Sequence, residues 1–283
     1  MGDVGSEALI ADIEAIELAF VSQWAHFGQG PAGEFHDDGD LTWLAAPVPE
    51  LPYNAVIRTR LGADADSRVD EVIGQYRDRG VQFLWLVHPT AQPTDIARRL
   101  DERGLSVVEH GTGMSLDLDH WRPSRRPNAP GVTYAEADTD AGLAAYEDLI
   151  AAYWELGAAS RRFVSGINRW AHELGHGVRF VAYEHGSPVG KAYLSWTLGE
   201  DAHAINDETA SIFGVYVAPA ARGLGIASGL MERLIERAAA AGRRRVVLHS
   251  SEMAVELYLR MGFAARCSLP VYATTTLHSL QPS

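Results

Sequence analysis

The stretch that decides the fold reads Val215-Tyr216-Val217-Ala218-Pro219-Ala220-Ala221-Arg222-Gly223-Leu224-Gly225-Ile226-Ala227. Its β-branched start predicts a strand that ends at Pro219. Apolar residues then recur at helical spacing from Ala227 to Ala238, with charged residues between them, so we expect an amphipathic helix. The stretch is therefore a strand, a glycine turn and a helix.

The turn has the properties of a phosphate site. The first turn of a helix has N–H groups without partners and carries partial positive charge. Gly223 and Gly225 let an anion approach these amides, and Arg222 adds a permanent cation. The motif is neither a Walker loop, because the only lysine is Lys191, nor Gly-x-Gly-x-x-Gly. The alternative is a tight connection that binds no ligand.

Downstream, residues 243–249 predict a buried strand, Ser250-Ser251 an N-cap, and residues 252–260 a helix that ends at Gly262-Phe263. With Leu257-Tyr258 on that helix, residues 211–263 resemble the GNAT superfamily of acyl-CoA-dependent N-acyltransferases. The resemblance implies an α/β (α+β) fold in which mixed, mainly antiparallel twisted sheets are flanked by helices. It also implies acetyl-CoA as co-substrate, without a metal.

The same resemblance implies roles for single residues. Main-chain groups of Val215, Tyr216 and Val217 would bond the pantetheine arm, helped by a splay or bulge at Gly214. The pyrophosphate would lie on Arg222, Gly223, Leu224, Gly225, Ile226, Ala227 and Ser228. Ser251 stands where many members have an asparagine that contacts CoA. Tyr258 matches the tyrosine that protonates the leaving thiolate, since a phenol with a pKa of about 10 is protonated at neutral pH; a core tyrosine is the alternative.

The general base is less well defined. Many members carry a glutamate where Ser211 stands here, and a serine cannot accept a proton from an ammonium group unaided. Nearby candidates are Asp207 and Glu208 before the strand and His249 at the end of the next strand. A solvated carboxylate or a capping histidine is the alternative for each, and water relays are a further route. The resemblance implies direct attack of the amine on the thioester, without a covalent enzyme intermediate. Cys267 has no basic partner in sequence, and we expect it to be a small buried residue.

The composition limits the class of protein, its partners and its expected cellular location. The 283 residues are 47% hydrophobic and 22% charged, which is ordinary globular usage. The net charge of −13 weighs against nucleic acid as a partner and mildly favours a cationic amine. No apolar run reaches the roughly 18 residues that span a bilayer, so no membrane partner is expected. A single cysteine and an arginine-rich, alanine-rich composition indicate a cytoplasmic bacterial protein.

Residues 121–131 are rich in proline and arginine and predict a linker. They separate residues 132–283, the expected catalytic domain, from residues 1–120, which we interpret as a degenerate copy. In that copy, strands at 55–60 and 81–87 alternate with helices at 68–79 and 94–103. Aligning Gly80 with Gly242 places Ala63 opposite Gly225, and aligning Gly104 with Gly262 places Leu100 opposite Tyr258. The carboxylates Asp64 and Asp66 would repel a phosphate and cap the helix themselves, so we expect no CoA binding there.

In the second half, a strand at 132–135, helices at 143–156 and 163–174, and a hairpin of 179–183 with 189–196 are expected. Tyr153, Trp154 and Trp196 are candidates for an acceptor pocket; core aromatics are the alternative. His172 and His176 have the spacing of a zinc pair without a third ligand, so we expect solvated histidines. An opening helix at 7–20 precedes aromatic residues at 24–31, for which we favour local packing over a role in a cleft between the halves.

Together these features predict an acetyl-CoA-dependent N-acetyltransferase acting on a primary amine of a small molecule. Two alternatives stay open: an inactive acyl-CoA-binding sensor, favoured by the missing strand glutamate, and an acetyltransferase of protein or peptide amines, which would need an acidic groove. The acceptor, the acyl chain and whether the chain forms a homodimer are open.

Overall fold

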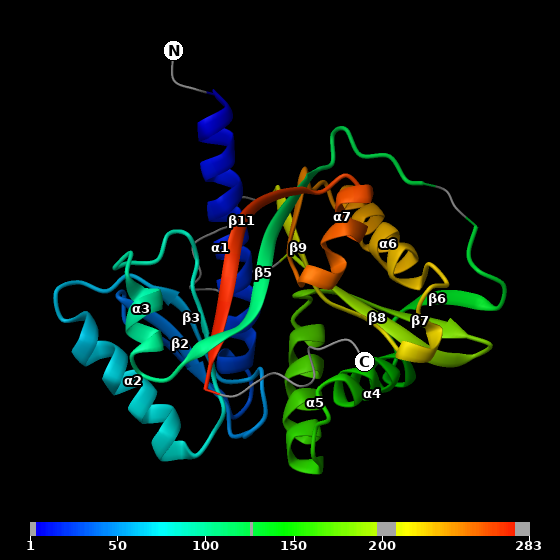
Figure 1. Ribbon diagram of the computed structural model, residues 1–283. Coiled ribbons are helices and arrows are strands. Elements are labelled where there is room, and N and C mark those ends of the chain that lie inside the picture. Colours follow the sequence, from blue (N-terminus) through cyan, green and yellow to red (C-terminus); the bar gives the residue numbers. More distant parts are fainter. Residues whose placement is uncertain (1–3, 125–126, 197–207, 275–283) are drawn as a thin grey trace.

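A computed structural model of the chain describes residues 4–124, 127–196 and 208–274. In these residues, strands from both halves join into one eleven-stranded sheet with helices on both faces (Figure 1). The order of strands is β1-β2-β3-β4-β11-β5-β10-β9-β8-β7-β6. The predicted α/β class with a mixed, mainly antiparallel sheet is confirmed, but the two expected sheets are continuous.

The first half contributes a long helix, two shorter helices and five strands. They are α1 (Val4–Gln29), β1 (Glu34–Asp37), β2 (Leu41–Ala45), β3 (Ala55–Thr59), α2 (Ala65–Arg79), β4 (Leu84–Leu86), α3 (Ile96–Asp101) and β5 (Ser106–Asp117). The strands and helices predicted for this half are present, although β4 and α3 are shorter than expected.

The second half repeats this plan with more residues. It comprises β6 (Val132–Glu136), α4 (Asp140–Tyr153), α5 (Ala158–Glu173), β7 (Gly177–Glu184), β8 (Ser187–Ser195), β9 (Thr209–Val217), α6 (Ile226–Ala240), β10 (Arg245–Ser250), α7 (Val255–Arg260) and β11 (Ala264–Ala273). Each half holds one parallel pair, β3 with β4 and β9 with β10, joined through a helix. The two halves therefore share a strand–helix–strand unit with parallel strands.

The halves exchange their last strands. β5 leaves the first half and pairs with β10, from Arg245↔Asp117 to Ser250↔Thr112. β11 leaves the second half and pairs with β4, and the two exchanged strands pair with each other at the centre of the sheet. Gly113 of β5 permits this contact, since a Cβ there would lie 2.6 Å from the Cys267 sulfur. Residues from each half therefore lie inside the sheet of the other.

α1 crosses the centre of this sheet and contacts β5, β9, β10 and β11. Two buried carboxylates hold it there. Asp12 lies 2.7 Å from Arg266 and 3.1 Å from Arg245, and Glu17 lies 2.7 Å from Arg60. The opening helix continues nine residues beyond its expected end at residue 20. It does so because Trp24 and Ala25 are buried and continue its apolar face.

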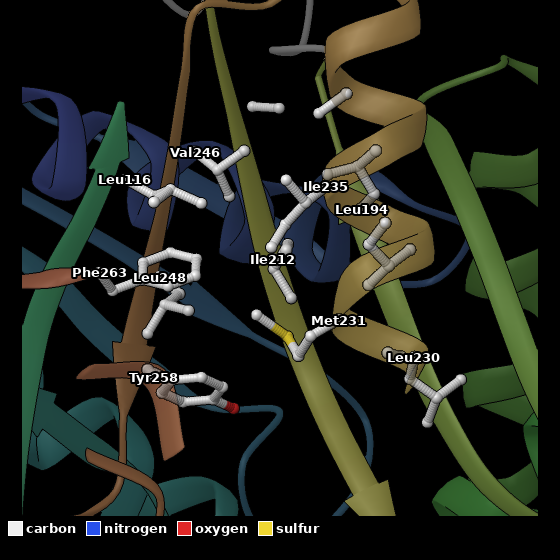
Figure 2. Packing of buried hydrophobic residues seen from close by; sticks show 14 of the residues in the cluster. Leu116, Leu194, Ile212, Leu230, Met231, Ile235, Val246, Leu248, Tyr258 and Phe263 are labelled. Carbon is white, nitrogen blue, oxygen red and sulfur yellow. The ribbon is translucent and has the colours of Figure 1, made fainter. Parts of the chain in front are cut away.

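Side chains alternate along β8 and divide the second half into two cores. Ala192 and Leu194 pack with α6 and α7, in a cluster that includes Leu116 of β5 (Figure 2). Lys191 and Tyr193 point to the opposite face, where Tyr193 packs with residues of α4. This second face, shared by α1, α4 and α5, is the one on which the candidate site lies.

Candidate functional site

The parallel pair β9 and β10 opens at its carboxyl end. Their pairing ends at Ile212↔Leu248, although β9 continues to Val217 and β10 to Ser250. On the other side of β9 the register with β8 shifts between Lys191 and Tyr193, where Gly214 has a φ of 58°. The strand thus has both the splay and the bulge expected at Gly214. Beyond Ile212, the edge of β9 that faces β10 has main-chain groups outside the ladder.

The glycine turn connects this splayed end to α6. Gly223 and Gly225 have φ values of 82° and 75°, and a Cβ on either would meet nothing within 4 Å. Gly225 is the N-cap of α6 and has no side chain to satisfy the first-turn amides. Ile226, Ala227 and Ser228 form that first turn, and Leu224 is exposed beside it. The turn is therefore an open cradle of N–H groups that a pyrophosphate fits.

A cavity of about 500 Å³ runs from the splay to the face covered by α1, α4 and α5. Arg222 and Ala227 lie at the end next to the turn, and the Arg222 guanidinium Nε donates to the Val217 carbonyl at 3.3 Å. Besides Arg222 and Ala227, the cavity brings together eight predicted residues, which are Tyr153, Trp154, Val215, Tyr216, Val217, His249, Ser251 and Tyr258. The predicted residues Gly223 to Ile226 and Ser228 do not line it. Trp196 does not line it either; it packs against the α6 core, where Arg237 lies 5.8 Å over its ring.

Tyr258 of α7 stands at the boundary between the core and the cavity. Its side chain is 5% exposed, and its ring packs 5.8 Å from that of Phe263. The hydroxyl points away from Phe263 and out of the packed cluster (Figure 2). Burial raises the pKa of the phenol above its usual value, so the group is protonated at neutral pH and can donate a proton.

The candidate general bases lie in different surroundings. Glu208 is exposed at the start of β9, the end remote from the bulge, and lies 3.6 Å from Arg244. The His249 ring stacks 3.9 Å from Phe20, and burial beside His88 keeps its pKa well below the usual range. Such an imidazole is a weak proton acceptor. Ser211 donates to the Ser195 carbonyl at 3.4 Å, and Asp207 lies outside the described residues.

Glu109 of β5 is a site residue that the sequence did not reveal. It is the one carboxylate that lines the cavity among the described residues. Burial, and secondarily the charge of Glu252, raise its pKa. No local motif marks Glu109, because the strand exchange alone carries it from the first half to the open end of β10.

Three aromatic residues of the segment 24–31 also line the cavity: Trp24, His26 and Phe27. The expectation that this segment packs only locally is therefore wrong. His26 stacks 4.3 Å from His176, which is buried rather than solvated, while His172 is half-buried. Burial and the nearby cation Arg179 lower the pKa of both stacked histidines, that of His26 to about 3.

The turn of the first half differs from that of the second, as expected. Asp64 is the N-cap residue of α2, but its side chain makes no capping hydrogen bond. Asp66 instead pairs with Arg99 and Arg103, the latter at 2.9 Å. The prediction that these carboxylates cap the helix is therefore wrong, because Arg99 of α3 and Arg103 just after it bind Asp66 instead. Leu100, the counterpart of Tyr258, is fully buried in that core.

The described residues contain no group of three or more His, Cys, Asp or Glu side chains placed to hold a metal ion. None of their helices combines the length and apolarity needed to cross a bilayer.

Residues 143–263 match the model of the acetyltransferase (GNAT) family. A search of curated proteins found no significant match. A GCN5-related N-acetyltransferase from Kribbella flavida has a similar structure, with a TM-score of 0.64 at 16% identity over 89% of this chain and 92% of that one. A tandem GNAT protein from the clavulanic acid biosynthesis pathway has a TM-score of 0.61 at 16% identity, over 95% and 94% of the two chains.

A protein of Staphylococcus epidermidis described as functionally unknown is also similar, with a TM-score of 0.60 at 15% identity over 87% of this chain and 94% of that one. At these identities the structural likeness establishes the fold, and the family match supplies the relationship. Residues 143–263 therefore form a GNAT acetyltransferase domain, and the chain has the fold of GNAT proteins, including a tandem one, over nearly its whole length.

Proposed function

We propose that the protein transfers an acyl group, most simply acetyl, from CoA to a primary amine of a small molecule. The observation that carries this proposal is that the splayed end of β9, Tyr258, and Arg222 and Ala227 on either side of the glycine turn line one cavity of about 500 Å³. Many of the side chains that line it are aromatic, and among the described lining residues Glu109 is the one carboxylate. This supports a small acceptor over a peptide, for which an acidic groove would be expected.

In the proposed reaction, the amine nitrogen bonds to the acyl carbon of the thioester while the carbon–sulfur bond breaks. The edge of β9 from Val215 to Val217 orients the pantetheine arm, and the turn from Arg222 to Ser228 holds the pyrophosphate. Tyr258 gives its proton to the thiolate, and Glu109 takes the proton that the amine loses. CoA supplies the activated carbonyl, so no covalent enzyme intermediate is needed.

We also propose a division of labour within the chain. Residues 132–283 carry CoA, residues 121–131 link the halves, and residues 1–120 have lost the cofactor turn while supplying Glu109 and the α1 wall. The cytoplasm of a bacterium is the proposed setting, supported by the composition.

The proposal is tested first by CoA binding. We expect Gly225→Asp to weaken CoA binding at least about 100-fold, because a carboxylate would enter the phosphate cradle. Isothermal titration calorimetry with CoA measures this affinity. Gly80→Asp is the matched control, since Gly80 also has a positive φ, 63°, and open space around it but lies at the end of α2. Equal affinity of the Gly225→Asp variant and the parent would contradict the cradle.

Turnover separates an enzyme from a sensor. We expect thiol release from acetyl-, propionyl- or succinyl-CoA with some member of an amine panel. Tyr258→Phe should lower kcat by about 10- to 100-fold with little change in CoA affinity, because it removes a proton donor and keeps the ring. CoA binding without turnover by any amine would favour the sensor, to which the serine at position 211 points.

A further inference from the structure

Arg179 of β7 is a buried cation that forms no ion pair with any described residue. It is 4% exposed, and its Nη1 has no hydrogen-bond partner in the described part of the chain. The guanidinium lies 4.6 Å from the Tyr193 ring centre, and its Nε donates to Asn168 at 3.4 Å. No described carboxylate comes within ion-pair distance. Arg179 lines the cavity, so its unused donors lie next to space that a ligand can enter.

Lys191 of β8 is a second cation in the same place. It is 3% exposed and also lines the cavity. Its Nζ donates to the Gly214 carbonyl at 2.8 Å, which places the ammonium at the bulge of β9. Among the described residues no carboxylate pairs with it. Burial lowers its pKa to about 7, and a bound anion would restore the charged form.

The two cations converge because of the strand register. Arg179 pairs with Tyr193 and Lys191 with Val181, so the two are diagonal neighbours on one face of β7 and β8. Both approach the Tyr146 ring of α4, at 5.9 Å for the Arg179 guanidinium and 5.4 Å for the Lys191 ammonium. They therefore form one positive site between the sheet and α4.

Among the described residues, the protein's own carboxylates compensate this site only in part. Burial raises the pKa of Glu147 and the charge of Arg179 acts against this rise, but Glu147 forms no ion pair with Arg179: it accepts from Ser165 at 2.8 Å and lies 3.6 Å from Arg169. His26 Nε2 and His176 Nδ1 are buried without partners in the described residues, and a neutral imidazole can donate to an anion. An uncompensated buried cation is costly, whereas a carboxylate that bonds a guanidinium in a fork is strongly held.

Resting on the proposed N-acyltransferase function, we propose that Arg179 and Lys191 bind a carboxylate of the acceptor. The acceptor class is then an amino acid or another amine that carries a carboxylate, rather than a polyamine. Because Lys191 touches the bulge where the thioester is expected, the carboxylate end is held close to the reacting amine.

The test compares each proteinogenic amino acid with the amine left when its carboxyl group is removed, using acetyl-CoA. We expect the parent protein to prefer an amino acid at least tenfold in kcat/KM. Arg179→Met should raise the KM for that amino acid at least tenfold while leaving the KM for its decarboxylated amine and for acetyl-CoA within twofold. Lys191→Met should act in the same direction. Arg162→Met, an exposed position on α5, is the matched control and should change none of these values.

Binding without turnover keeps this inference separate from the proposed function. In a thermal-shift titration with each proteinogenic amino acid, at least one should raise the melting temperature of the parent and of Arg179→Lys, but not of Arg179→Met. Such a shift without thiol release would support the carboxylate site and contradict the enzyme. Equal use of amino acids and their decarboxylated amines would overturn the site. So would an Arg179-dependent preference for succinyl-CoA over acetyl-CoA, which would assign the cations to the donor.

Discussion

Glu109, Arg179 and Lys191 show how burial gives single residues their chemistry. All three line one cavity. There each ionisable group is shielded from the water that would stabilise its charged form. The carboxyl of Glu109 has a raised pKa and the ammonium of Lys191 a lowered one, in both cases mainly because burial opposes charge. Arg179 cannot respond in this way, because a guanidinium keeps its proton. Arg179 therefore stays charged and is stabilised by a nearby anion, whereas Glu109 and Lys191 can gain or lose a proton.

The pH profile tests the role of Glu109. A base acts when ionised, so kcat/KM for the acceptor should rise with pH through the raised pKa of this carboxyl. Glu109→Gln should abolish that rise and lower kcat about 100-fold or more. Glu252→Gln is the matched variant: it removes the charge that helps raise the pKa of Glu109 and should shift the rise to lower pH. A Glu109→Gln variant with the parent's profile would exclude this role.

At the scale of elements, the helix α1 is the one whose packing differs most from its expected role. It was expected to be a short opening helix, yet it crosses the sheet centre and covers histidines as well as apolar side chains. His88 is 4% exposed, neither ring nitrogen has a partner in the described residues, and Phe20 of α1 lies 5.9 Å away. Burial lowers the pKa of His88 to about 4. The packing of α1 thus requires a neutral imidazole.

This requirement predicts acid sensitivity. The unfolded chain binds a proton at His88 below about pH 6.5, and the folded chain only below about 4. Stability from the neutral ring is therefore present above pH 6.5 and is lost as pH falls toward 4. Between pH 7 and 5 we expect His88→Leu to lose about 1–2 kcal/mol less unfolding free energy than the parent. Urea unfolding measures this.

The control for this experiment is His120→Leu, whose imidazole is 87% exposed. It should lose the same stability as the parent between the two pH values. Equal losses in all three proteins would show that His88 does not couple α1 packing to pH.

At the scale of the whole molecule, the exchange of β5 and β11 makes the halves interdependent. Without β5, β10 would have an open edge, and without β4 and β5, β11 would have no partner. We expect one cooperative transition in calorimetry of the full chain. Residues 132–283 expressed alone should aggregate, and co-expression with residues 1–131 should restore a soluble complex. Two separate transitions, or a folded isolated second half, would contradict this interdependence.

Local signals were enough for much of the fold. The glycine turn, the amphipathic helix after it and the strands on either side follow from the period of apolar residues and from the conformations that Gly223 and Gly225 permit. The same signals predicted that Leu100 and Ala63 replace Tyr258 and Gly225 in the first half. These features depend on neighbours along the chain, so a sequence displays them directly.

The composition of the cavity depends on contacts between distant segments, and only the tertiary structure decided it. Glu109 and Gly111 enter through a strand that crosses from the other half, and Trp24 and His26 through a helix that runs farther than its pattern suggested. Arg179 and Lys191 meet through a β-sheet register. Pairing partners and register follow from packing of the whole chain, which no local spacing encodes. The sequence by itself determined where CoA is expected to lie, whereas the tertiary structure decided which side chains surround the acceptor.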